Sequence, residues 1–200
     1  MKKENKEIIS IVLLVFLPII LFFASFLMGR YPVSPIDVIK TILSPIFPQL
    51  AVSSTVNTIV WQIRLPRILA AILVGASLSM AGTAFQGIFK NPLVSSDLLG
   101  VSNGAGFGAT LAILLSGSGI VIQIFAFVFG IISVSITYLI SRAYKAGGIL
   151  ILVLSGVAIS AFFNSLISAI KFVADPEDKL PEIVYWLMGS WLQLQWMKLS

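Results

Sequence analysis

The sequence contains neither cysteine nor histidine. Without cysteine it can form no disulfide and offers no thiolate, and without histidine it lacks the imidazole that binds zinc or haem and that most often carries acid–base catalysis. Charge is also scarce, because Asp, Glu, Lys and Arg together make up 10% of the residues. These absences exclude imidazole-based metal sites and histidine-based catalysis within the 200 residues.

What the chain has in excess is apolar residues, at 58% of the composition with a mean hydropathy of +1.04. This is far from the balance of a soluble domain and indicates an integral membrane protein. No charged residue occurs in 8–29, 68–89, 98–141 or 146–170. Each stretch is at least as long as the roughly 20 residues that a helix needs to cross a bilayer. The third is about twice that length, and the turn-forming "SGSG" at 116–119 divides it.

The sequence therefore predicts an all-α fold, a polytopic membrane helical bundle. Helices are expected because backbone groups in lipid must be hydrogen-bonded, and the alternating pattern of barrel strands is absent. A short surface helix is expected in "SPIDVIKTIL", with Ser34 as its cap. After the last span, acidic residues, prolines and tryptophans indicate an interfacial segment at about 175–197. The five predicted spans cover about 8–29, 67–88, 97–115, 120–140 and 147–170.

The N-terminus reads as a membrane anchor with a cytoplasmic end. A cleaved signal peptide is the alternative, but the apolar run is too long and no small-residue cleavage site follows it. Lys2, Lys3 and Lys6 place the N-terminus inside by the positive-inside rule. With this orientation the 13 basic residues divide into six inside and seven outside, so the plain count does not settle orientation, which depends on these three lysines.

Two arginines, Arg64 and Arg67, flank a proline immediately before the second span. They are either interfacial anchors whose long side chains reach toward water or a contact surface for an acidic partner. Pro66 suits the first turn of a helix, which would put Arg67 at the positive end of the helix dipole, where a cation is disfavoured. If the helix extends back to Arg64, the two side chains could share one face.

The second span is rich in small residues, which is typical of helices that pack closely on other helices in a membrane. Gly75, Ser79 and Gly82 are the small residues expected on its packing face. By contrast, the fourth span is mostly bulky and is expected to be peripheral and to face lipid.

The stretch "KNPLVSSDLLGVSNGAGFGA" at 90–109 is the most unusual of the chain. Asn91 and Pro92 break the second span at the inner surface, and Asp97 places a carboxylate at or within the membrane, where polar groups need partners or water. Gly100 and Gly104, spaced by four, allow either tight helix packing or an irregular backbone beside a cavity. The glycines fit no dinucleotide fingerprint, and the sequence contains no P-loop for ATP.

Taken together, "RLPRILAAILVGASLSMAGTAFQGIFKNPLVSSDLLGVSNGAGFGA" resembles the FecCD family, the permease subunits of ABC importers for iron-siderophores, haem and cobalamin. The order R-L-P-R, V-G-A-x-L-x-x-x-G, Q-x-x-x-x-N-P-L and L-L-G-V-S-N-G-A is specific as a set. "YWLMGSW" matches the motif after the fifth span. The resemblance extends over about residues 8–198.

The resemblance implies a larger assembly. Family members have ten spans per subunit and pair as a homodimer or with a paralogous second permease subunit. Two cytoplasmic ATPase subunits drive them, and an extracytoplasmic binding protein delivers the chelate. The chain is thus expected to hold about five of ten spans and to end before the loop that contacts the ATPase. It is expected to be no enzyme itself and to need no cofactor, with ATP hydrolysed by the partner subunit in the cell membrane.

The resemblance also assigns roles to single positions. Arg64 and Arg67 match the outward-facing arginines on which acidic residues of the binding protein dock. Asn91 and Leu93, in the N-P-L turn, match the inner gate of the translocation pathway.

Other function classes fit less well. A secondary carrier or channel usually has charged residues in mid-membrane, and the second and fifth spans have none. A membrane-embedded enzyme would lack histidine, cysteine and paired carboxylates within a span. No basic stripe with interleaved aromatics indicates nucleic acid. No metal ligand set is expected, so the cargo would travel as an intact chelate, with siderophore, haem and cobalamin left open.

Overall fold

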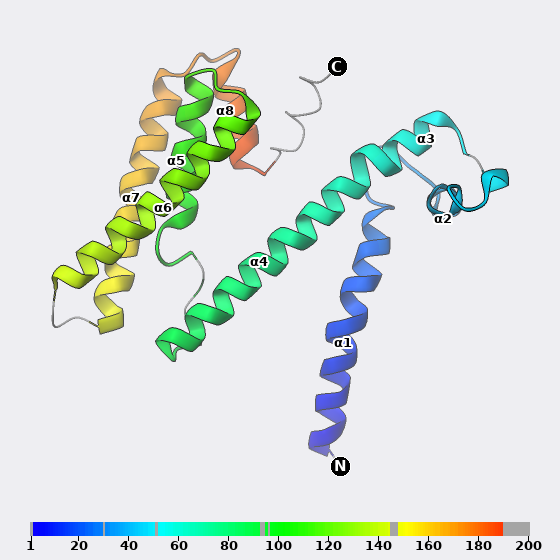
Figure 1. The fold of residues 1–200 in the computed structure, drawn as a ribbon, viewed down its shortest axis with the longest axis horizontal. Helices are drawn as coiled ribbons and strands as arrows, with labels where there is room; N and C mark the ends of the chain where they lie inside the picture. The colour runs from blue at the N-terminus through cyan, green and yellow to red at the C-terminus, as the bar shows by residue number, and fades with distance from the viewer. Residues whose placement is uncertain are drawn as a thin grey trace. The chain divides into compact units, whose positions relative to one another are not determined.

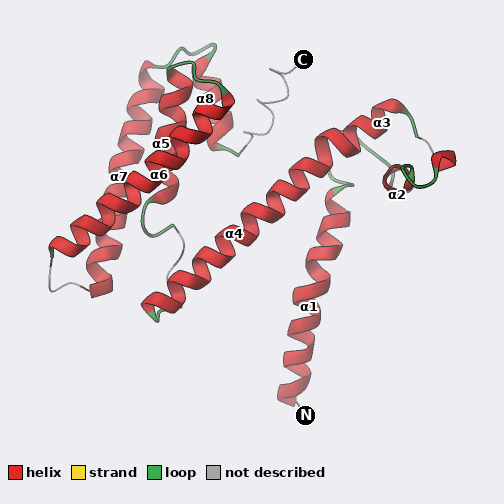
Figure 2. Cartoon of the chain, in the orientation of Figure 1, coloured by secondary structure: helices red, strands yellow, loops and turns green. Residues whose placement is uncertain are grey.

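The computed structural model describes residues 2–29, 31–50, 52–92, 95, 97–144 and 148–189, and in these ranges all regular structure is helical (Figures 1 and 2). The prediction of an all-α polytopic bundle is confirmed. The chain divides into two compact units, Met1–Ser77 and Leu78–Ser200, with α4 crossing the boundary. Each unit is described by itself.

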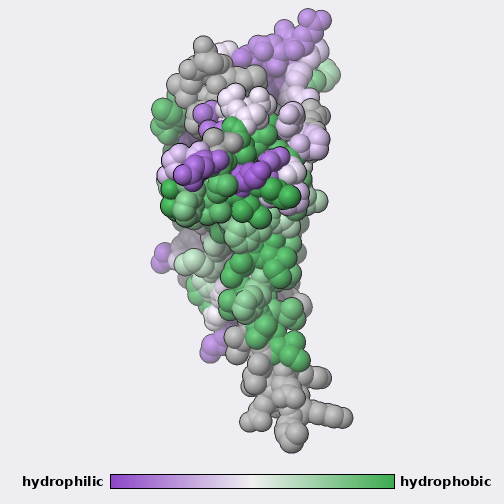
Figure 3. All heavy atoms as spheres, turned by 90° about the vertical axis from the view of Figure 1, so that its right-hand side faces the viewer, coloured by the Kyte–Doolittle hydropathy of each residue, from purple (hydrophilic) through white to green (hydrophobic). Residues whose placement is uncertain are grey.

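The first unit contains two long helices and the connection between them. Helix α1 covers Lys2–Ser25, and hydrophobic side chains cover its described part in Figure 3. The predicted surface helix is confirmed as α2, Pro35–Leu43, whose N-cap Ser34 accepts a hydrogen bond from the backbone N–H of Asp37. A 3-10 turn, η1 (Pro48–Leu50), leads to the short helix α3, Ser54–Thr58.

The helix that contains the arginine motif begins earlier than its proline suggests. Helix α3 runs through a π-helical segment, η2 (Ile59–Arg64), into α4 (Leu65–Phe89), so one helical run covers Ser54–Phe89. The expectation that Pro66 lies in the first helical turn is therefore wrong. The backbone N–H of Leu65 donates to the carbonyl of Val60, five residues back. This wider turn lies where the proline ring would otherwise press on the carbonyl four residues before it.

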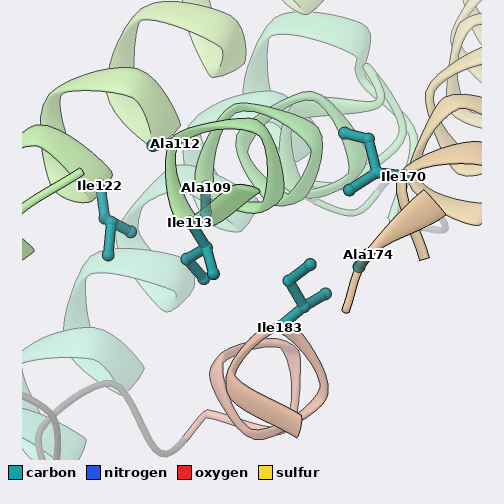
Figure 4. Close-up of a cluster of buried hydrophobic side chains, with 7 residues drawn as sticks. All are labelled: Ala109, Ala112, Ile113, Ile122, Ile170, Ala174 and Ile183. Atoms are coloured by element: carbon teal, nitrogen blue, oxygen red, sulfur yellow. The ribbon is translucent and has the colours of Figure 1, made fainter. Parts of the chain in front are cut away.

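The second unit is built around α5, Val101–Leu114, which packs against α6 (Gly119–Ala143), α7 (Gly148–Val173) and α8 (Lys179–Leu187). The predicted division at 116–119 is confirmed, because α5 ends at Leu114 and α6 starts at Gly119. Figure 4 shows the buried apolar cluster that these four elements share. Its members are Ala109, Ala112, Ile113, Ile122, Ile170, Ala174 and Ile183.

Helices occur at all five predicted spans, but their lengths differ. Among the described residues, three helical runs are long and apolar enough to cross a membrane, namely Ser54–Phe89, Gly119–Ala143 and Ile149–Val173. Two shorter apolar helices, Val12–Ser25 and Val101–Leu114, lie at the first and third predicted spans. The third begins at residue 101 rather than 97 because Gly100 adopts a left-handed conformation, with φ of +74°.

Helix α6 has two different faces, which corrects the expectation of a purely peripheral, lipid-facing span. Phe127 is 70% exposed, as expected for a lipid-facing side chain. Another side of the helix packs closely on α5 and carries the buried residues Gly130, Ser133 and Thr137. Because these residues are small, the two helices can approach closely. The bulky residues around them made this pattern hard to recognise in the sequence.

Candidate functional site

Arg64, one of the two motif arginines, is buried in the first unit, with 7% of its surface exposed. Its Nη1 donates a hydrogen bond to the carbonyl of Phe26, and its Nη2 donates to the carbonyl of Tyr31. Both acceptors belong to the segment that follows α1, more than 30 residues earlier in the chain. The guanidinium thus joins η2 to the end of the first helix.

An apolar cluster encloses this contact. Its buried members are Phe26, Val33, Val38 and Val60, which come from the segment after α1, from α2 and from η2. Trp61 adds a polar link, because its Nε1 donates to the carbonyl of Thr41 on α2 at 3.2 Å. The connection between the first two long helices is therefore packed against α3 and η2.

Arg67, the second arginine, is exposed on the first turn of α4. Although the helix does extend back to Arg64, the two side chains do not form a common cationic face, because one is buried and the other is not. The ion pairs within the described ranges both involve Lys179, which lies 3.5 Å from Asp178 and 3.7 Å from Glu182. Docking of a binding protein on the motif stays a prediction, and Arg67 is the arginine that offers a free charge for it.

The predicted gate turn begins where α4 ends. Lys90 adopts a positive φ of 48°, and the N–H of Asn91 donates to the carbonyl of Gln86 at 3.2 Å, which is the bond expected when a left-handed residue closes a helix. The side chain of Gln86 donates to the carbonyl of Pro92 at 3.2 Å and holds the turn against the helix. Leu93 lies outside the described residues, so the pairing of Asn91 with Leu93 as a gate stays a prediction.

Residues 97–100, the segment directly before α5, are not helical. The N–H of Gly100 donates to the carbonyl of Asp97 at 3.0 Å, and the carboxylate of Asp97 accepts from the N–H of Ser102 at 3.4 Å. A carboxylate at the start of a helix satisfies a free backbone donor and interacts favourably with the helix dipole. The carbonyl of Gly100 accepts the N–H of Gly104 at 3.0 Å, and the carbonyls of Leu99 and Gly100 both take a partner on α6.

Two hydroxyl groups of α6 fasten that segment. Ser133 Oγ donates to the carbonyl of Gly100 at 2.8 Å, and Thr137 Oγ1 donates to the carbonyl of Leu99 at 3.1 Å. Both side chains are fully buried. Irregular backbone in a membrane protein needs such internal partners because lipid provides none.

Glycines let the segment and α5 approach their neighbours. A Cβ at Gly156 of α7 would lie 1.8 Å from the carbonyl oxygen of Leu98, and a Cβ at Gly104 would lie 2.5 Å from the Cβ of Ser133. Gly100 has a left-handed φ, which residues with a side chain rarely adopt. A Cβ added to it would lie 2.9 Å from Ser160 Oγ of α7. The structure has close packing at Gly104 and irregular backbone directly before α5, whereas a cavity beside that backbone stays a prediction.

The small residues of α4 are placed differently. A Cβ at Gly75 or Gly82 would meet nothing within 4 Å among the described residues, and Ser79 is exposed. The packing role predicted for Gly75, Ser79 and Gly82 therefore stays a prediction, because the described residues do not provide the contacts that it requires.

The anchoring residues Ser133 and Thr137 were not singled out from the sequence. A signal was present, because two hydroxyl residues four apart on an otherwise bulky span lie on one helix face. What the sequence could not supply was their acceptors, two carbonyls more than 30 residues away.

Comparison with known proteins decides the family. Residues 16–200 match the FecCD transport family, which includes both the arginine motif and the anchored segment. The chain belongs to the FecCD transport family. In the described residues of this FecCD chain, no group of three or more Asp or Glu side chains is placed to hold a metal ion.

Several relatives are permease proteins of importers. The chain is 39% identical over 171 residues to the molybdate import system permease protein MolB of Haemophilus influenzae, covering 86% of this chain and 50% of that protein. It is 47% identical over 137 residues to a Helicobacter pylori protein described as an iron chelatin transport system permease, covering 68% and 41%. To the vitamin B12 import permease BtuC of Salmonella arizonae it is 38% identical over 151 residues, covering 73% and 44%.

A solved structure supports the same family. It is described as an inward-facing conformation of a metal-chelate type ABC transporter and superposes with a TM-score of 0.69 at 36% identity. The match covers 93% of this chain and 55% of that one. The chain spans about half the length of the curated relatives that it matches.

Proposed function

We propose that this chain is the membrane-spanning permease part of an ATP-driven importer that moves a metal chelate into the cytoplasm. The observation that carries the proposal is the FecCD match over residues 16–200. Relatives described as iron chelatin and vitamin B12 permeases support a chelate as the cargo class. An iron(III)-siderophore, haem or a cobalamin fits that class. Since the chain has no histidine or cysteine, it would carry such a cargo intact rather than coordinate its metal.

The proposed assembly follows the family pattern. A second permease subunit, identical or paralogous, completes the pathway, cytoplasmic ATPase subunits supply free energy, and an extracytoplasmic binding protein delivers the chelate. The permease lies in the cell membrane with its N-terminus in the cytoplasm, as Lys2, Lys3 and Lys6 favour. The motif of Arg64 and Arg67 then faces outward for docking, with Arg67 as its exposed member, and Asn91 with Leu93 forms the inner gate.

The geometry of the second unit supports a gate at this place. The turn after α4 is held by Gln86 through the carbonyl of Pro92, and the segment before α5 is held by Ser133 and Thr137. Residues 93–96 connect these two fastened ends, and a rearrangement there would leave the helices on either side intact. This is the property that alternating access requires of a gate element.

The test is transport by the assembled permease, ATPase and binding protein in proteoliposomes. We expect uptake of one chelate of the iron-siderophore, haem or cobalamin class that requires ATP and the binding protein. Uptake driven by an ion gradient without ATP would instead support a secondary carrier. Uptake of molybdate alone would replace the chelate by an oxyanion, in line with the molybdate relative.

A further inference from the structure

Helix α2 is held in the first unit by one of its faces. Val38 and Thr41 are buried on this face, and Val38 belongs to the apolar cluster that contains Phe26, the first residue after α1. The carbonyl of Thr41 accepts a hydrogen bond from Nε1 of Trp61 at 3.2 Å. The position of α2 is therefore fixed beside the end of α1 and beside η2.

The other face of α2 consists of large apolar side chains. Ile36, Ile39 and Leu43 are spaced by three and four residues and therefore share one side of the helix. Ile46 and Phe47 extend this side, since the backbone N–H groups of both donate to the carbonyl of Leu43. Between 36% and 71% of the surface of each of these five residues is exposed. Together they form the apolar face of α2, and a patch of this kind indicates an interaction surface.

The membrane is the apolar phase nearest to this face. The apolar stretch of α1 extends to Ser25, and the helical run Ser54–Phe89 is long and apolar enough to cross a membrane. The connection that contains α2 therefore lies where α1 and this run reach the membrane surface. In Figure 1 α2 is seen nearly end-on whereas α1 runs in the plane of the picture, so α2 lies crosswise to α1. A helix that lies crosswise to a spanning helix runs along the membrane plane.

Side chains typical of the boundary between membrane and water surround α2. Tyr31, between α1 and α2, is half-exposed, and Trp61 is partly exposed while its Nε1 holds the carbonyl of Thr41. Tyr and Trp are enriched at this boundary because their rings are apolar and carry one polar group. Lys40 follows Ile39, is exposed and forms no ion pair within the described ranges. Its long apolar stem lets the ammonium reach lipid phosphates, so these residues favour lipid over an apolar protein surface.

We propose that α2 is an interfacial helix whose apolar face is inserted into the lipid at the boundary between headgroups and acyl chains. Amphipathic helices that lie in the membrane plane bury their apolar side at this depth. Because its other face is packed beside α1 and η2, α2 also sets the height of the arginine motif above the lipid. The insertion concerns the first unit and depends neither on the cargo nor on the partner subunits of the proposed function.

The test measures how often a nitroxide label on α2 collides with reagents that dissolve in lipid or in water. Because the 200 residues contain no cysteine, Ile39→Cys gives the chain a single site for the label. The permease is reconstituted in vesicles of phosphatidylcholine and phosphatidylglycerol without binding protein. Electron paramagnetic resonance compares collisions with oxygen, which concentrates in lipid, and with nickel ethylenediaminediacetate, which stays in water. Thr55→Cys, at an exposed position of the polar helix α3, is the matched control.

At Ile39 we expect a ratio of oxygen to nickel collisions several-fold higher than at Thr55. Leu43→Cys should give the same result and decides the matter if the Ile39 variant does not fold. A ratio at Ile39 equal to that at Thr55 would place the apolar face in water and overturn the proposal. Low collision rates with both reagents would overturn it as well, because a second copy of the chain or another protein would then cover the face.

Discussion

The hydroxyl of Ser133 donates a 2.8 Å hydrogen bond to the carbonyl of Gly100, a residue 33 positions earlier that has a left-handed backbone conformation. One helical turn further along α6, Thr137 binds the carbonyl of Leu99 in the same way. Both acceptors lie in the non-helical segment before α5, and both donors are fully buried. The segment is thereby fixed to the packed part of the second unit.

Removing these two anchors should release the segment. In the double variant Ser133→Ala with Thr137→Val, both carbonyls lose their hydroxyl donors, although that of Gly100 keeps the backbone N–H of Gly104 at 3.0 Å. We therefore expect the cost of about 1–3 kcal/mol to come mainly from the carbonyl of Leu99. We expect a lower midpoint of unfolding in detergent and faster maleimide labelling of a cysteine introduced at Ser95. Ser135→Ala is the control, because the exposed Ser135 hydroxyl binds the carbonyl of Ile131 on its own helix. Equal labelling rates in the double variant and the control would contradict the anchoring role.

Gly156 should tolerate no side chain. In Gly156→Ala the added Cβ would lie 1.8 Å from the carbonyl oxygen of Leu98, so α7 and the segment before α5 must separate. We expect a loss of about 3 kcal/mol or more, at the upper end of overpacking effects, measured by unfolding in mixed detergent. Gly130→Ala is the matched control, because its Cβ would have ordinary contacts from 3.6 Å. A Gly156→Ala variant as stable as the control would show that the approach of α7 is not this close.

The small-residue face of α4 can be tested directly. If Gly75, Ser79 and Gly82 pack on another helix in the assembled permease, Gly82→Leu should destabilise it by about 1–3 kcal/mol through overpacking. Met80→Leu, a change that conserves volume at a position 73% exposed, serves as the control. Thermal aggregation of the assembled permease compares the two. Unchanged stability in Gly82→Leu would remove the packing prediction for this position.

Arg67 should contribute to encounter with the binding protein. Arg67→Glu reverses an exposed charge, and we expect the association rate to fall about tenfold at low ionic strength, with a smaller effect when salt screens the interaction. Surface plasmon resonance on the reconstituted permease measures the rate. Arg142→Glu, at the exposed end of α6 and on the face predicted to be cytoplasmic, is the control. An association rate that is equal in the two variants would argue against docking on Arg67.

The helices themselves were largely predictable from the sequence. Long stretches without charge predicted where α4, α6 and α7 run, and the cap at Ser34 predicted α2, because these signals act over neighbouring residues. The early start of the helix before Pro66 was missed. A π-helical turn accommodates the proline there, and whether such a turn forms depends on how η2 packs against the segment after α1.

By itself the sequence determined that this is a helical membrane protein, and its ordered motifs determined the family, since both depend on residue type and spacing along the chain. Only the tertiary structure decided that Arg64 is buried and Arg67 is exposed. They are three residues apart and chemically identical, so no local pattern distinguishes them. What distinguishes them is the segment after α1, where the carbonyls of Phe26 and Tyr31 lie more than 30 residues away in sequence but accept hydrogen bonds from Arg64.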